Sequence, residues 1–194
     1  MRRVLVRRAR GDRGVALVEA VFVLPIVLTV VLAIMEFGLL FAAQSTTNSS
    51  TRDGVRFGSA NFAVSGSNQA AADAIMAAVT KDLGARTNLD TPIKLWIYKA
   101  NSNGFPSTNT DFSSCAADCY RYTWTSGAFV YDAASPAWTN PAACIDPTNG
   151  LNTLDSMGVY LEVSHKYITG AFGTSQVMKE HTVGRLEPLP LTQC

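Results

Sequence analysis

The chain has 194 residues, 47% of them hydrophobic, and a formal net charge of +1. Six of its sixteen basic residues precede Val15, against the single acid Asp12, which leaves ten basic and fourteen acidic residues in 15–194. The mildly acidic body argues against a nucleic-acid-binding surface, and a basic tip directly before an apolar run favours membrane topology over an RNA-binding arm.

An apolar run over residues 15–41 carries only two charged side chains, Glu19 and Glu36. As a helix it would span roughly 40 Å, which exceeds the ~30 Å hydrocarbon core of a bilayer. It is also longer than the apolar region of a secretory signal, typically ~7–15 residues. We therefore predict a transmembrane helix over 15–43. The basic segment 1–14 is a leader that stays in the cytoplasm, so that the rest of the chain lies outside it.

Beyond the anchor, the sequence predicts a small extracytoplasmic α+β domain over residues 64–194. Residues 44–63 continue the first helix, although their Ser, Thr and Asn content is unfavourable for helix propensity. A break at 64–67 precedes a short amphipathic helix over 68–83, where apolar residues recur at helical spacing.

Period-two alternation then predicts an antiparallel sheet. Its strands are expected at 93–98, 120–124, 128–131, 158–167 and 175–185. Between them lie two long loops rich in Asn, Ser, Thr and Pro, at 101–119 and 132–152. Loops of this length are usually functional, cross-linked or mobile.

All the cysteines follow the anchor. They are Cys115, Cys119, Cys144 and Cys194. An even number in an oxidising compartment predicts two disulfides, and three pairings are open. A metal site is the weaker alternative, because a lone C-x3-C with only His165 and His181 elsewhere lacks the paired spacing of zinc ligands. We expect no metal and no cofactor.

Catalytic motifs such as G-x-S-x-G, H-E-x-x-H and the Walker loop do not occur in the sequence. His165 and His181 lie in strand-like stretches without an assigned nucleophile, so we interpret them as surface residues and predict no enzymatic activity. An alternative function is an uncleaved, single-pass anchor that displays a glycan-binding module through Trp96, Trp124 or Trp138. Together with the nearby tyrosines they alternate in a way that suggests that most of these aromatic residues line the two faces of a sheet, which favours packing instead.

Glu19 lies five residues beyond Gly14, inside the apolar segment. A carboxylate in a lipid-facing helix is costly and generally has a partner. If the chain were cut after Gly14, the new amine on Val15 would place an opposite charge at the same depth, and Glu19 of one chain could neutralise that amine on another. The alternative, that Glu19 reaches the headgroups, stays open. Glu36 is expected to reach the headgroups at the opposite interface.

The string G-V-A-L-V-E at 14–19, followed by an apolar run with Pro25, resembles the type III signal of prepilins. It is most similar to TadE-like proteins, the minor pseudopilins of the Tad (tight adherence, Flp) pilus system. The segments M-E-F-G at 35–38 and R-D-G-V-R-F at 52–57 are similar to the E-F-G and R-E-G-A-R segments of that family. Ala20 stands where the major Flp pilin carries tyrosine, which favours a minor pilin.

This resemblance implies that a membrane-embedded aspartic prepilin peptidase cuts the precursor between Gly14 and Val15. Glu19 would then be the fifth mature residue and would serve assembly. The implied partners are the lipid bilayer, the peptidase and other subunits of the Tad pilus and secretion machine. The implied location is the inner membrane, as a single-pass protein with a cytoplasmic N-terminus, and the implied function is pilus assembly, adhesion and biofilm formation.

Overall fold

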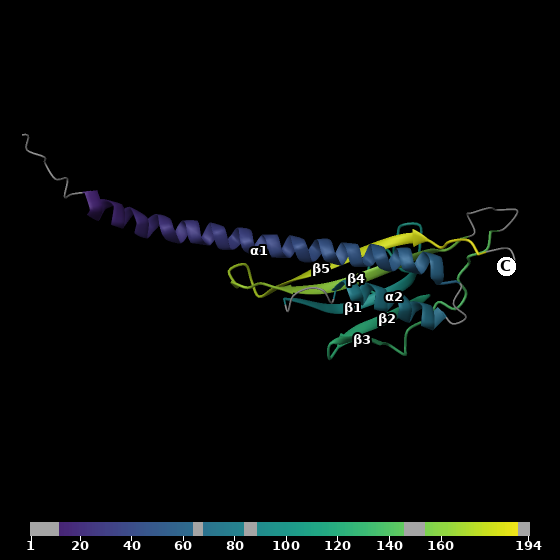
Figure 1. Cartoon of the computed structure of the whole chain (residues 1–194). Coiled ribbons are helices and arrows are strands. Elements are labelled where there is room, and N and C mark those ends of the chain that lie inside the picture. The colour runs from purple at the N-terminus through teal and green to yellow at the C-terminus, as the bar shows by residue number, and fades with distance from the viewer. Residues whose placement is uncertain (1–11, 64–67, 84–88, 146–153, 190–194) are drawn as a thin grey trace, which may run out of the picture. The chain divides into compact units, whose positions relative to one another are not determined.

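The computed structural model describes residues 12–63, 68–83, 89–145 and 154–189 (Figure 1). Two compact units make up the chain, Met1–Leu39 and Leu40–Cys194. The described elements are α1 (Asp12–Asn61), α2 (Asn68–Leu83), β1 (Asp90–Ala100), β2 (Cys119–Thr125), β3 (Ala128–Tyr131), β4 (Ser156–Lys166) and β5 (Ser175–Arg185). A long apolar N-terminal helix, a short helix and an antiparallel sheet confirm the predicted α+β class.

The five strands form one sheet in the order β3-β2-β1-β4-β5, with every neighbouring pair antiparallel. The central strand β1 therefore pairs with two strands that lie far from each other in the sequence. The strands expected at 120–124 and 128–131 are confirmed as β2 and β3, which form a hairpin with Thr125 opposite Ala128. Its two turn residues, Ser126 and Gly127, have φ of 52° and 89°. Positive φ at both positions is the geometry that suits the twist of a two-residue hairpin.

In the polar stretch of α1, hydroxyl groups donate to carbonyls one turn earlier in the same helix. Thr47 donates to the Ala43 carbonyl at 2.9 Å, and Ser50 donates to the Thr46 carbonyl at 2.9 Å. These bonds satisfy hydroxyls that are buried in the second unit. Tertiary packing thus overrides the unfavourable propensity noted in the sequence.

One face of the sheet packs against α2 and the second part of α1 and forms the main core. Close approach depends on glycines: a Cβ added at Gly54 would lie 2.6 Å from Val79 Cγ2. Near the end of α1, Phe62 packs against Trp138, with ring centroids 4.9 Å apart. The core of this unit therefore contains α1 residues as well as the sheet.

A second cluster covers the opposite, outer face of the sheet. Phe112 stacks on Tyr160 with ring centroids 4.3 Å apart, and Trp96, Tyr98 and the Cys115–Cys119 disulfide are buried beside them. The loop over residues 101–118 is held down by hydrogen bonds, among them the one from Tyr98 Oη to the Gly104 carbonyl at 2.8 Å. Of the alternatives for this loop, cross-linking is the one observed.

Candidate functional site

The predicted site residues Gly14, Val15 and Glu19 lie in the first turns of α1. The helix begins at Asp12, so the Gly14–Val15 peptide bond lies within its first turn. Both residues are exposed, and a Cβ placed at Gly14 would have no neighbour within 4 Å. Glu19 is exposed as well, and it lies about 7.5 Å from Gly14 along the helix axis. The three residues therefore lie close together near the beginning of the described part of α1.

Apart from Glu19 and Thr29, the stretch from Val15 to Met35 consists of apolar residues, and all of it except Ala33 is exposed. Within the described residues, α1 is long and apolar enough to cross a membrane. A helix that is hydrophobic all round is typical of an element surrounded by protein or lipid. No hydrogen bond or ion pair joins Glu19 to another described residue. A lone carboxylate therefore lies on an otherwise apolar surface.

The expectation for Glu36 was wrong. Its side chain is only 2% exposed, so protein atoms cover the carboxylate and it does not extend toward lipid headgroups. A buried carboxylate is normally paired or hydrogen-bonded, because desolvation of an unpaired charge is costly. The E-F-G segment that contains Glu36 thus includes a buried acid, which the position of the residue at the end of an apolar run did not indicate.

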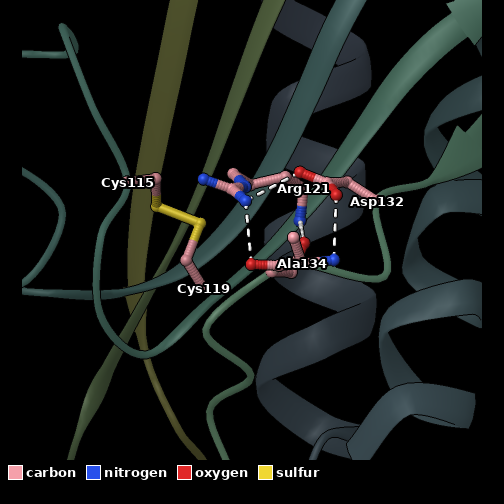
Figure 2. A network of polar contacts seen from close by, with 6 residues as sticks. Cys115, Cys119, Arg121, Asp132 and Ala134 are labelled. Atoms are coloured by element: carbon pink, nitrogen blue, oxygen red, sulfur yellow. Dashed lines mark hydrogen bonds and ion pairs between the residues drawn. A yellow bond between two sulfur atoms is a disulfide. The ribbon is translucent and has the colours of Figure 1, made fainter.

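A disulfide joins Cys115 to Cys119, four residues apart, at the start of β2 (Figure 2). Cys144 is disulfide-bonded too, and Cys194 lies outside the described residues. Next to the first disulfide, Arg121 Nη2 lies 2.7 Å from Asp132 Oδ2 and donates to the Ala134 carbonyl at 2.9 Å. These bonds fix the segment after β3 against β2. The contacts point to a structural role for both features.

The residues considered for catalysis and glycan binding do not form one site. His165 is buried rather than on the surface, which corrects the sequence-based interpretation. Its Nδ1 lies 2.6 Å from Asp90 Oδ1. His181 is exposed on β5 and contacts Phe112 on the outer face. The two histidines therefore lie in different environments, and among the described residues neither forms a hydrogen bond with a Ser, Thr or Cys side chain.

The tryptophans do not share an exposed surface either. Trp138 is buried in the main core, and Trp96 is buried on the outer face beneath Lys94, whose Nζ lies 4.5 Å from the ring centroid. Trp124 is half-buried and packs against Phe129. Packing, the interpretation favoured by their alternation, accounts for Trp96 and Trp138.

A polar cluster on the outer face was missed in the sequence. Glu162 is buried and accepts a hydrogen bond from Tyr160 Oη, while Lys94 Nζ lies 3.1 Å away and Lys179 Nζ 3.8 Å away. Burial, followed by the hydrogen bond and the negative charge of Glu162, raises the pKa of Tyr160 well above its ordinary value. A single acid within the apolar strand M-G-V-Y-L-E-V was the available signal. Because its charge is already paired, we assign this cluster to stability.

The R-D-G-V-R segment is divided between core and solvent. Gly54 and Val55 are buried against α2 and the sheet, whereas Arg52, Asp53 and Arg56 are exposed. This arrangement gives the segment a packing role through its glycine. It also presents charged side chains on the outside of α1.

Comparison with protein families shows a match between residues 14–56 and the family described as TadE-like protein. The matched segment begins at Gly14 and includes Glu19, the E-F-G segment and the R-D-G-V-R segment. No curated protein and no solved structure matches the chain.

Proposed function

We propose that the chain is a membrane-anchored minor pilin that takes part in Tad pilus assembly. The match of residues 14–56 to the family described as TadE-like protein supports this proposal. The observation that carries this proposal is the exposed apolar stretch of α1 from Val15 to Met35, in which Glu19 is the single carboxylate. Such a surface is costly in water and is stabilised by lipid or by other apolar helices. Adhesion and biofilm formation would follow from participation in the pilus.

In this proposal the Gly14–Val15 bond is cut by a prepilin peptidase. The leader of residues 1–14, with its six arginines, stays in the cytoplasm and fixes the orientation. After the cut, the amine of Val15 and the carboxylate of Glu19 are opposite charges about 6 Å apart along the helix axis. A pair of this kind within one chain, or between neighbouring chains, removes an isolated charge from the apolar phase.

The first test of the proposal is the mature N-terminus. We expect mass spectrometry of chains co-expressed with the peptidase to find Val15 as the first residue. Gly14→Val should remain uncut, and the open space around Gly14 makes this a test of recognition rather than of folding. Chains that keep Met1 in the presence of an active peptidase would contradict the proposal.

The second test separates assembly from cleavage. Glu19→Ala should be cut normally but assemble less well, because its carboxylate can no longer neutralise an amine in the apolar phase. Val21→Ala, at an exposed apolar position nearby, is the matched control and should assemble like the parent. Normal piliation by Glu19→Ala would show that its charge has no part in assembly.

A further inference from the structure

The turn between β4 and β5 is apolar and exposed. We call residues 168–173, with the sequence I-T-G-A-F-G, the apolar turn; it contains no charged residue. Ile168 is 61% exposed and Phe172 is 48% exposed. Backbone bonds define its shape: Tyr167 N–H donates to the Thr174 carbonyl at 3.1 Å, and Gly173 N–H donates to the Gly170 carbonyl at 3.3 Å. It therefore presents two large apolar side chains on a hydrogen-bonded turn.

The direction of α1 within the second unit shows which end of that unit carries the turn. Gln44 Nε2 donates to Glu180 Oε1 at 3.2 Å, and the Thr51 and Thr182 hydroxyls are 3.0 Å apart. Along these contacts the residue numbers of α1 and β5 increase together, so the two elements run in the same direction. The beginning of β5, and the turn before it, thus lie at the end where the chain enters the unit.

The turn also extends past the point of entry. Leu40, the first residue of the unit, is about 6 Å from Gln44 along the helix axis. Gly173 is seven residues before Glu180, which corresponds to about 23 Å along an extended strand. The apolar turn consequently projects about 17 Å (23 − 6 Å) beyond the level of Leu40, at the end of the unit that carries Leu40.

We propose that the apolar turn inserts into the interfacial layer of the bilayer in which the apolar part of α1 is anchored. This inference rests on the proposed membrane anchorage. Since Leu40 follows the apolar segment without a linker, the end of the unit that carries Leu40 is held next to the bilayer by chain connectivity. The side chains of Ile168 and Phe172 then leave water for the acyl-chain boundary.

The residues that flank the turn fit the same environment. Lys166 is exposed and Tyr167 is half-buried, directly before Ile168. A lysine can extend its ammonium toward phosphates, and tyrosine is enriched at the level of the headgroups. The turn is therefore a second membrane contact besides α1, and it fixes how the folded unit is oriented over the bilayer.

Depth-dependent fluorescence quenching tests this proposal on the full chain in vesicles of phosphatidylcholine and phosphatidylglycerol with brominated acyl chains. Phe172→Trp and Ile168→Trp each place a reporter in the turn, and the parent, with Trp96, Trp124 and Trp138, gives the background. Phe22→Trp, within the apolar segment, is the positive control for insertion. The expected result is a loss of emission for both turn variants that exceeds the loss for the parent.

Val130→Trp is the matched control within the folded unit. Val130 is 52% exposed. In the sheet register Val130 pairs with Thr123, Thr123 with Lys94, and Lys94 with Glu162, so Val130 and Glu162 lie at the same level along the strands. That level is six residues, or about 20 Å, before Ile168. Quenching at the turn without added quenching at Val130 supports the proposal.

Three other outcomes overturn it. Quenching at both Phe172 and Val130 means that the unit lies flat on lipid without a specific contact by the turn. Quenching at Phe22 without quenching at either turn position shows that the chain is anchored but the turn stays in water or contacts protein. An unquenched Phe22→Trp removes the membrane anchorage itself, and the proposed function fails with it.

Discussion

A methyl group added at Gly54 tests whether the R-D-G-V-R segment is a packing motif. An alanine Cβ would lie 2.6 Å from Val79 Cγ2, and the neighbouring Ile75 and Val159 methyl groups lie 3.6 Å away. Val79 is buried and branched at Cβ, so it has little freedom to turn aside. Overpacking of a core costs about 1–3 kcal/mol, whereas alanine gains about 1 kcal/mol over glycine in helix propensity. We therefore expect Gly54→Ala to lower the free energy of unfolding by about 1 kcal/mol.

Denaturant unfolding of the full chain in detergent, followed by tryptophan fluorescence, measures this change. Ser49, exposed on the same helix, supplies the propensity control: the difference between Ser49→Ala and Ser49→Gly gives the alanine preference without a packing change. Val79→Ala alone should cost about 2 kcal/mol through lost burial and a cavity. A net cost of about 1 kcal/mol for Gly54→Ala corresponds to a clash of about 2 kcal/mol offset by about 1 kcal/mol of helix propensity. In the double variant Gly54→Ala/Val79→Ala the clash is relieved, so its cost should be about 2 kcal/mol less than the sum of the single variants.

Two results would refute this reasoning. The Ser49 variants give the change in free energy of unfolding that helix propensity alone would produce. If Gly54→Ala changes the free energy of unfolding by that amount and no more, α1 and α2 can move apart freely. Strict additivity in the double variant would show that Val79 is not the group that a larger residue at Gly54 meets.

Two further predictions concern the folded unit. Replacing Cys115 and Cys119 by alanine should lower the free energy of unfolding by about 2 kcal/mol, the chain-entropy value for a loop of about five residues; an unchanged denaturation midpoint would contradict a stabilising cross-link. Burial, with added repulsion from Tyr131, raises the pKa of Tyr120 to about 12, so its contribution to stability is fully present below its ordinary pKa of 10.0 and is lost as the pH rises through about 12. In alkaline unfolding, Tyr120→Phe should lose stability less steeply than the parent over that range, and parallel curves would show that Tyr120 is not responsible.

Local signals in the sequence were sufficient for the elements and for the proposed anchor. The apolar run after Gly14, the helix over Asn68–Leu83 and the two short strands expected at 120–124 and 128–131 each depend on residues a few positions apart. Helical periodicity, period-two alternation and turn chemistry act over that range, so a single sequence displays them. The similarity of residues 14–56 to TadE-like proteins also lies in contiguous residues.

Tertiary structure alone decided which distant residues meet. The central position of β1 brings Tyr160 and Glu162 beside Lys94, and no spacing in the sequence encodes that pairing. The burial of His165 beside Asp90 arises in the same way, from β1 and β4 lying next to each other. Strand order is set by the sum of many weak contacts across the whole core, which is why these placements required the folded chain.

The level of the apolar turn is a further case. Its composition is visible in the sequence, but its place beyond Leu40 follows only from α1 and β5 running side by side in the same direction. The sequence by itself therefore predicts a membrane anchor that is preceded by a cleavable signal. The fold decided that a second apolar element projects from the end of the unit where that anchor enters.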